Sequence, residues 1–452
     1  MFSKILIANR GEIALRIARS CRELGIKTVA VYSEADDKSL HLKLADETVC
    51  IGPPDSRKSY LHQERILDVA KKTGAQAIHP GYGYLAENAT FAMACQDHGF
   101  AFIGPTPRNL KLAGDKIVAR KMMEQAGVPV VPGSRGPVGS MDEARIEAER
   151  IGYPVMLKSG GGGGGRGIRI CRNREALAEE FPIAGMEARA SFGNGELYVE
   201  KYIAGPRHIE FQILADRDGN TIHLGERECT IQRRFQKLIE ESPSPFLTSG
   251  LRERMGNAAV AAARAINYFN AGTVEFLVDG NGNFYFMEMN ARIQVEHPVT
   301  ELTTGLDLVK EQIRLAWGMP LPVSLNPVES GGWAIECRIN AEDPERNFAP
   351  CPGTIKEYQP PGGFGVRLDT HLYQGYELPI YYDSLLAKLI THDRTREGAI
   401  RIMKRALTEF RISPVKTTIP LHLKIMDDPV FQSGDFTTDY IRKFVPDDDE
   451  DE

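Results

Sequence analysis

Residues 155–170 read VMLKSGGGGGGRGIRI, and this stretch decides the fold. Two strand-like segments, 155–158 and 166–170, flank Ser159 and six consecutive glycines. Glycine lacks a Cβ and tolerates positive φ, so backbone N–H groups in such a loop can approach an anion and form a phosphate-binding nest. The stretch therefore predicts a β-hairpin whose glycine-rich tip closes over phosphate.

Three other interpretations of the glycine run are weaker. A flexible linker is also rich in glycine, but a linker is not expected within a hairpin flanked by Lys158 and Arg166. A Walker A loop is excluded because the chain contains no Gly-Lys dipeptide. The run satisfies the pattern G-x-G-x-x-G, but a strand follows it where a dinucleotide-binding turn requires a helix.

Phosphate bound under such a loop requires nearby cations. Lys158 beside the loop and Lys116 in the run AGDK are the candidates, although a lone lysine is usually a solvated surface residue. Upstream, the Pro- and Gly-rich stretch 128–137 suggests a hinge. Downstream, residues 200–203 (EKYI) lie at the end of an apolar run. A hinge between two lobes at this point could contact the edge of an adenine ring.

Two carboxylates are predicted to face each other further along the chain. Residues 272–277 (GTVEFL) and 284–290 (FYFMEMN) resemble strands and flank a turn-rich stretch, so a hairpin places Glu275 beside Glu288, with Asn290 two residues on. Like charges directly opposite each other destabilise a sheet unless a cation compensates them. Carboxylate and amide oxygens suit Mg²⁺, so we favour a metal site over a solvent-facing pair.

The next segment, 292–301 (RIQVEHPVTE), combines an arginine, an amide and a carboxylate. In an extended backbone Arg292, Gln294 and Glu296 would all point one way, where they could hold a small oxyanion and accept its proton. The alternative is a surface strand with a neutralising ion pair. The charge-dense run 226–237 could add anion ligands or form a surface loop, and Arg338, within an apolar stretch, requires a buried partner.

The first 105 residues alternate short apolar runs with amphipathic segments. Strands are expected at 5–8, 28–32, 48–51, 77–79 and 100–103, which is the pattern of a doubly wound parallel sheet. The turn 9–12 then lies at the carboxyl edge of this sheet, where ligands bind in such folds.

Composition limits the class of protein. A length of 452 residues suggests about three domains. The net charge of −6 resides in the six acidic residues at the end, so nothing indicates nucleic-acid binding. No apolar run is long enough to span a bilayer, and the first ten residues do not form a signal peptide. Seven cysteines without a C-x-x-C pair indicate reduced thiols, mostly in the core, in the cytoplasm.

The chain resembles the biotin carboxylases, including the stand-alone subunits of bacterial acyl-CoA and pyruvate carboxylases. The likeness extends from about residue 2 to 445. It rests on the glycine loop and on four motifs: IANRGEIA (7–14), HPGYGYLAEN (79–88), MEMNARIQVEHPVTE (287–301) and ECRINAEDP (336–344).

The resemblance implies an ATP-grasp fold of mixed α/β and α+β class. It divides the chain into an N-terminal doubly wound domain (1–115), an ATP-grasp domain (116–330) with a mobile glycine-rich lid at about 130–204, a mixed C-terminal domain (331–446) and an acidic disordered tail (447–452). It also implies ATP, Mg²⁺ or Mn²⁺, and biotin supplied on a separate carrier protein.

Site residues follow from the matched positions. The positions expected to contact ATP are Lys116, Lys158, Gly163, Gly164, Gly165, Glu200, Lys201, Ile203, His208, Gln232, Glu275 and Glu288. The expected metal ligands are Glu275, Glu288 and Asn290. The expected bicarbonate and biotin contacts are Lys237, Arg292, Gln294, Val295, Tyr82 and Arg338. The expected catalytic residues are Glu296, Arg292, Arg338 and Lys237.

The implied reaction begins when Glu296 deprotonates bicarbonate for attack on the γ-phosphate of ATP. The product, carboxyphosphate, breaks down to CO₂ and phosphate. Phosphate takes the N1 proton of biotin while Arg338 stabilises the ureido oxyanion, and Tyr82 lies beside the biotin.

Two departures from the family pattern and two competing functions remain. Phe235 stands where a histidine is usual near the nucleotide, which predicts an altered ATP affinity, and Ser159-Gly160 replaces Ala-Ser or Ala-Ala. Another carboxyphosphate- or acyl-phosphate-forming ATP-grasp ligase would lack the 292–301 and Arg338 motifs. A nucleotide-binding scaffold would bind ATP without turnover.

The partners expected from the resemblance are a biotin carrier protein, carboxyltransferase subunits and a second copy of the chain. The chain has no Met-Lys-Met site for attached biotin and ends before any carboxyltransferase domain, so the carrier and the carboxyltransferase are expected as separate chains.

Overall fold

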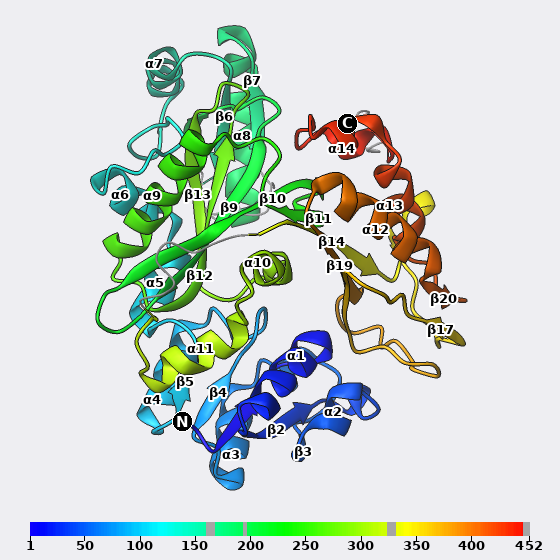
Figure 1. The fold of residues 1–452 in the computed structure, drawn as a ribbon. Helices are drawn as coiled ribbons and strands as arrows, with labels where there is room; N and C mark the ends of the chain where they lie inside the picture. The colour runs from blue at the N-terminus through cyan, green and yellow to red at the C-terminus, as the bar shows by residue number, and fades with distance from the viewer. Residues whose placement is uncertain (160–167, 193–196, 323–330, 446–452) are drawn as a thin grey trace.

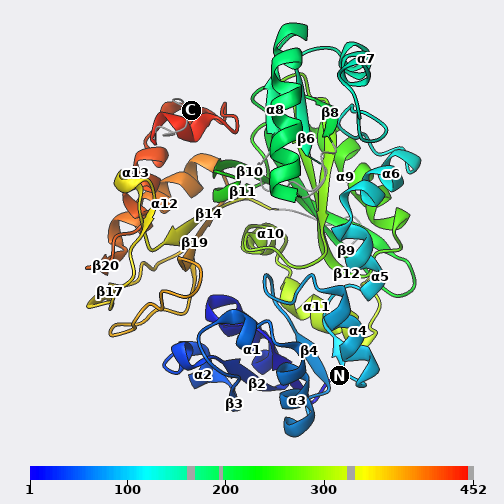
Figure 2. The same ribbon diagram turned by 180° about the vertical axis from the view of Figure 1, so that it is seen from behind.

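The computed structural model describes residues 1–159, 168–192, 197–322 and 331–445. Figures 1 and 2 show three parts around a central helix, α10 (His297–Thr304): an N-terminal unit, a lid, and a large sheet that continues into the C-terminal part. None of the helices in these ranges has both the length and the apolar character needed to cross a membrane.

The N-terminal unit contains the predicted doubly wound sheet. Its strands are β1 (Lys4–Ile7), β2 (Lys27–Tyr32), β3 (Glu47–Cys50), β4 (Ala77–His79) and β5 (Ala101–Phe102), each within one residue of its predicted ends. All four pairings are parallel, in the order β3-β2-β1-β4-β5. Ile5 and Ile7 share a core cluster with α1 (Gly11–Glu23), and Leu6 shares one with α3 (Gln63–Thr73), so helices cover both faces.

The strand order reverses direction between β1 and β4, and two motifs meet at this point. Asn9, directly after β1, donates hydrogen bonds from Nδ2 to the backbone oxygens of Pro80 and Tyr82, each at 2.7 Å. Ligands of doubly wound sheets bind at such a switch point, outside the carboxyl ends of the strands. The predicted position of the turn 9–12 is therefore confirmed.

The lid is a small unit with a core of its own. β6 (Val155–Ser159) pairs antiparallel with β7 (Ile168–Cys171) and with β8 (Leu197–Lys201). The helices α7 (Met141–Ile151) and α8 (Arg174–Phe192) enclose the core of this sheet. The predicted hairpin is confirmed, while its glycine tip, with Gly163, Gly164 and Gly165, lies outside the described residues.

The large sheet has eight antiparallel strands in the order β13-β12-β9-β10-β11-β14-β19-β18. Their bounds are β9 (Arg207–Ala215), β10 (Thr221–Arg233), β11 (Gln236–Ser242), β12 (Asn270–Val278), β13 (Phe284–Asn290), β14 (Trp333–Asn340), β18 (Val366–Thr370) and β19 (Leu385–Asp393). Because β11 pairs with β14, the segments on either side of the predicted boundary at 330/331 share one sheet.

Alternation along β9 assigns the two faces of this sheet. Ile209, Phe211 and Ile213 share a core cluster with residues of α9 (Ser249–Ala265). His208, Glu210 and Gln212 therefore point to the opposite face, toward α10.

The other α-helices and the short strands lie outside these three sheets. The helices are α2 (Leu40–Leu44), α4 (Ala89–Asp97), α5 (Pro107–Gly114), α6 (Lys116–Gln125), α11 (Leu308–Trp317), α12 (Arg396–Glu409), α13 (Ile419–Met426) and α14 (Pro429–Ser433). The short strands are β15 (Glu342–Asp343), β16 (Ala349–Pro350), β17 (Glu357–Gln359) and β20 (Arg411–Ser413).

Candidate active site

A buried ammonium group surrounded by three carboxylates forms the centre of the site. Lys237 Nζ lies 2.6 Å from Glu210 Oε2, 3.0 Å from Glu275 Oε1 and 2.6 Å from Glu296 Oε1. Burial alone would lower the pKa of Lys237, but the negative groups around it raise that pKa well above its ordinary value. Lys237 is therefore a fixed positive charge inside the protein.

Glu296 lies between two cations. It precedes the first turn of α10, and its side chain is completely buried. Its second oxygen, Oε2, lies 2.9 Å from Arg338 Nη2. Burial would raise the pKa of Glu296, but Lys237 and Arg338 hold it well below the usual range of a carboxyl group. Glu296 is thus ionised and has a proton-accepting oxygen beside each cation.

Arg338 has the buried partner that its apolar surroundings require. It lies on β14, and its Nε donates to Glu240 Oε1 on β11 at 2.6 Å. Burial raises the pKa of Glu240 and the Arg338 contact lowers it; burial has the larger effect, and the pKa rises to about 7. The guanidinium is therefore held by two carboxylates, those of Glu240 and Glu296.

The segment before α10 differs from its prediction. Residues 291–294 form no strand, and the backbone has already turned at Glu296 (φ −78°, ψ 8°). Gln294 nevertheless reaches the cluster, where its Nε2 donates to Glu275 Oε1 at 2.8 Å. Arg292 lies at the rim, with Nη2 donating to Asn290 Oδ1 at 3.0 Å. The alternative of a surface strand is wrong because Gln294 and Glu296 are buried.

The predicted carboxylate pair forms on the β12–β13 hairpin, where Glu275 lies directly opposite Glu288. Glu275 Oε2 lies 3.0 Å from His208 Nε2, and its Oε1 accepts a hydrogen bond from Asn290 Nδ2 at 2.8 Å. Glu288 is partly exposed and lies 3.2 Å from Lys116 Nζ. Two carboxylates and an amide on one hairpin offer hard oxygen donors, so these residues would fit a magnesium ion.

The described lid residues that are predicted to contact ATP lie in its sheet or directly after β8. Lys158 on β6 forms an ion pair with Glu200 on β8. Lys201 Nζ donates to the carbonyl oxygens of Gly152 and Tyr153 at 2.8 and 3.0 Å, and Ile203 is buried. Lys158 and residues 201–203, where the chain leaves β8, therefore belong to the same small unit.

The charge-dense run 226–237 is not a surface loop. It forms the β10–β11 hairpin, in which Gln232 lies opposite Lys237. Arg227 is completely buried and donates from Nη1 to Gln212 Oε1 at 2.7 Å. Only the hairpin tip protrudes, and Phe235 there is 66% exposed.

Tyr82, a predicted biotin contact, and Val295, a predicted bicarbonate contact, lie where the N-terminal unit approaches α10. The Tyr82 hydroxyl donates to Glu12 Oε1, and the Val295 carbonyl accepts a hydrogen bond from Lys388 Nζ at 3.0 Å. Tyr82 thus comes from the 79–88 motif, Val295 from the 287–301 motif and Arg338 from the 336–344 motif.

The sequence did not single out Glu210, Arg227, Glu240 or Lys388. Glu210 could have been found, because it alternates with His208 and Gln212 along a β-strand. The other three are charged residues in strands whose partners lie far away in the chain, so they have no local signal.

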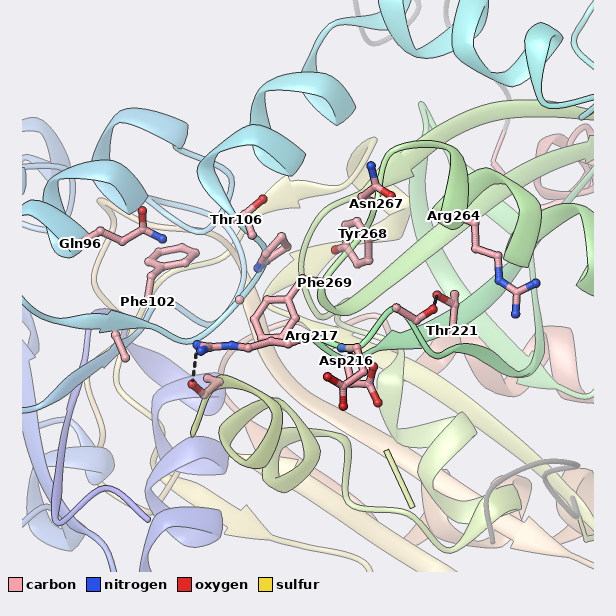
Figure 3. A pocket seen from close by; sticks show the side chains of 16 residues that line it. Gln96, Phe102, Thr106, Asp216, Arg217, Thr221, Arg264, Asn267, Tyr268 and Phe269 are labelled. Atoms are coloured by element: carbon pink, nitrogen blue, oxygen red, sulfur yellow. Dashed lines mark hydrogen bonds between the residues drawn. The ribbon is translucent and has the colours of Figure 1, made fainter. Parts of the chain in front are cut away.

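A cavity of about 660 Å³ lies apart from this cluster, between β5 and the β9–β10 turn (Figure 3). None of the predicted site residues lines it. Asp216, on its wall, accepts hydrogen bonds from Asp218, Asn220 and Leu321, and Arg217 donates to the Ala316 carbonyl. Asp216 and Arg217 are thus engaged within the fold, and the cluster around Glu296 is the candidate active site.

Three family models match successive parts of the chain. They are the biotin carboxylase N-terminal domain over residues 1–110, the ATP-binding domain of the carbamoyl-phosphate synthase L chain over 115–324, and the biotin carboxylase C-terminal domain over 336–443.

Similar proteins cover almost the whole chain. Biotin carboxylase 1 of Bacillus subtilis is 58% identical over 98% of this chain and 99% of that protein. A pyruvate carboxylase subunit of Methanothermobacter thermautotrophicus is 54% identical over 98% of this chain and 90% of that protein.

Two solved structures are also close. The biotin carboxylase domain dimer of 2-oxoglutarate carboxylase from Hydrogenobacter thermophilus, in complex with MgADP, ADP and bicarbonate, has a TM-score of 0.90 and 54% identity over 98% of each chain. The biotin carboxylase of Campylobacter jejuni, in a complex with beta-gamma-ATP, has a TM-score of 0.92 and 48% identity over 98% of this chain and 99% of that chain.

Proposed function

The chain belongs to the biotin carboxylase family, and from that premise we propose how its own residues divide the work of the reaction. The chain uses ATP and bicarbonate to carboxylate biotin on a carrier protein, through carboxyphosphate. This is the first half-reaction of acetyl-CoA carboxylase and of related acyl-CoA and pyruvate carboxylases.

The observation that carries the assignment of roles is the buried Glu296 carboxylate between Lys237 and Arg338. Bicarbonate binds against Lys237, Arg292, Gln294 and the Val295 peptide. An anion that accepts hydrogen bonds from Lys237 competes with Glu296 for this cation, which raises the pKa of Glu296 and makes it a better base. Glu296 takes the proton, the resulting carbonate oxygen attacks the γ-phosphorus, and ADP leaves.

The lid and the β12–β13 hairpin hold the nucleotide. Lys158, Glu200, Lys201, Ile203 and the glycine loop contact ATP from the lid, and Lys116, His208 and Gln232 contact it from the sheet. Glu275, Glu288 and Asn290 hold Mg²⁺, which neutralises phosphate charge when it is bound. The fixed charges of Lys116 and Lys158 do the same from the protein side.

The second stage requires a cation beside the biotin ring. Carboxyphosphate breaks down to CO₂ and phosphate, phosphate takes the N1 proton, and N1 attacks CO₂. Arg338 stabilises the negative charge on the ureido oxygen, and Tyr82 lies beside the ring. Glu240 holds the Arg338 guanidinium in place for this task.

Partners and location follow from the same proposal. We place biotin on a separate carrier protein and the second half-reaction on carboxyltransferase subunits, and we expect a homodimer. The relatives include one component of a pyruvate carboxylase and one of a 2-oxoglutarate carboxylase at equal identity, so the partner carboxyltransferase determines the final acceptor. A cytoplasmic location is supported by the seven unpaired cysteines.

ADP release by the purified chain tests the function. With Mg²⁺ and ATP, we expect release to depend on bicarbonate and to increase when free biotin is added. Release that needs bicarbonate but ignores biotin would identify another carboxyphosphate-forming ligase. ATP binding without any release would identify a nucleotide-binding scaffold.

A further inference from the structure

We propose that Lys388, on β19, is a positioning residue that holds the Val295–Glu296 peptide and links the bicarbonate side of the site to the biotin side. The proposal rests on the roles assigned above to Glu296, Val295 and Tyr82. It adds a residue that lies about 90 positions from the proposed catalytic base in the chain.

Lys388 is completely buried. It makes one hydrogen bond and one ion pair, with residues from two different parts of the fold. Its Nζ donates to the Val295 carbonyl at 3.0 Å and lies 3.2 Å from Glu12 Oε1. Val295 directly precedes the base Glu296, and Glu12 is in the first turn of α1. The Lys388 ammonium therefore connects β19 of the large sheet with the N-terminal unit and with the turn that carries Glu296.

The contact with Val295 fixes the orientation of the Val295–Glu296 peptide. A trans peptide is planar, so a held carbonyl also fixes the direction of the following N–H and the start of the Glu296 side chain. Glu296 is the N-cap of α10 and makes no side-chain cap hydrogen bond. Its carboxylate is held by Lys237 and Arg338, while Lys388 holds the backbone carbonyl that precedes it. A small displacement of a catalytic base can reduce the rate about 100-fold.

The contact with Glu12 extends the link to the biotin side. Glu12 accepts the hydrogen bond of the Tyr82 hydroxyl, and the Lys388 ammonium lies 6.0 Å from the centre of the Tyr82 ring. In the sheet, Lys388 lies directly opposite Arg338 on β14 and Asp369 on β18. The same ammonium thus neighbours the two residues assigned to biotin.

Simple charge balance is the competing explanation. A buried lysine is costly unless it is paired, and Glu12 and Asp369 can be regarded as its counter-ions. Under that explanation, loss of Lys388 would reduce stability and leave the kinetic constants near the wild-type values, and removal of the Glu12 charge in the same protein would restore the stability.

The test compares Lys388→Met with the double variant Glu12→Gln/Lys388→Met in the full chain. The wild type must first show biotin-stimulated, bicarbonate-dependent ADP release, because its absence would overturn the proposed function rather than this inference. We expect Lys388→Met to raise KM for bicarbonate and to lower kcat with biotin, each about tenfold or more, while MgADP affinity changes less than about twofold. The double variant should regain thermal stability but keep the kinetic defect.

Arg396→Met is the matched control, since Arg396 is a buried cation bound to Glu241, away from the site. It should lose stability without a change in KM for bicarbonate. If Lys388→Met does not fold, the double variant alone decides the question. Kinetic constants within about twofold of the wild type in either folded Lys388 variant would overturn the proposal.

Discussion

Glu296 and Arg338 are joined by an ion pair of 2.9 Å, although 41 residues separate them in the chain. Glu296 is the proposed base for bicarbonate and Arg338 the proposed cation for the biotin oxyanion. The two stages of the reaction therefore share one buried contact. Bound bicarbonate also interacts with Lys237, and Glu296 becomes neutral when it takes the bicarbonate proton. The ion pair between Glu296 and Arg338 then weakens, just before Arg338 is required to stabilise the biotin oxyanion.

Arg338→Gln separates the two stages. The variant removes the charge that stabilises the ureido oxyanion, so biotin-dependent carboxylation should fall about 100-fold or more. ADP release that depends on bicarbonate alone should fall much less, because Lys237 still compensates Glu296. The measurement is ADP release and biotin carboxylation in parallel; an equal loss of both would contradict separate roles for Arg338 and Lys237.

Glu288→Gln tests the metal site. Glu288 lies opposite Glu275 and is only partly buried, so its loss should weaken Mg²⁺ binding without unfolding the hairpin. We expect the Mg²⁺ concentration for half-maximal ADP release to rise about tenfold or more. Asp68→Asn, on an exposed face of α3, is the control and should not change it. An unchanged Mg²⁺ requirement in Glu288→Gln would place the metal elsewhere.

Stability should fall on mild acidification because of buried neutral histidines. His422 is completely buried, its ring nitrogen lies 2.8 Å from the Arg338 carbonyl oxygen, and burial lowers its pKa to about 4. The unfolded chain binds this proton near pH 6.5, so the stability contribution is present above that pH and is lost as pH falls toward 4.

Urea unfolding followed by tryptophan fluorescence measures this effect. Between pH 7 and 5, His422 should account for a loss of about 2 kcal/mol. His422→Gln cannot titrate, so its unfolding free energy should depend less on pH by that amount. Equal pH slopes in the two proteins would show that His422 is not the titrating group.

Local patterns predicted the parts of the site that have local signals. The register of Glu275 with Glu288 followed from the turn-rich residues between them, and the five N-terminal strands followed from apolar runs. The extended backbone expected through Glu296 was wrong, because Pro298 favours the first turn of a helix and α10 starts there.

Long-range pairs could not be predicted in the same way. Lys388 lies in the largely apolar strand β19, and Glu240 lies in β11 among other charged residues. In both sequences a charged residue on a solvent-facing side of the strand would look identical. Only the sheet order, which places β11, β14 and β19 side by side, shows that both are buried against the site. Their roles depend on Arg338, Glu12 and Val295, which lie far from them in the chain.

The most direct test of the central claim is bicarbonate-dependent ADP release by Glu296→Gln. Glutamine keeps the shape of the side chain but cannot accept the proton, so the rate should fall about 1,000-fold while MgADP affinity changes less than about twofold. Glu253→Gln, an exposed position on α9, is the matched control and should retain the wild-type rate. A folded Glu296→Gln that keeps more than about a tenth of the wild-type rate would contradict its assignment as the base.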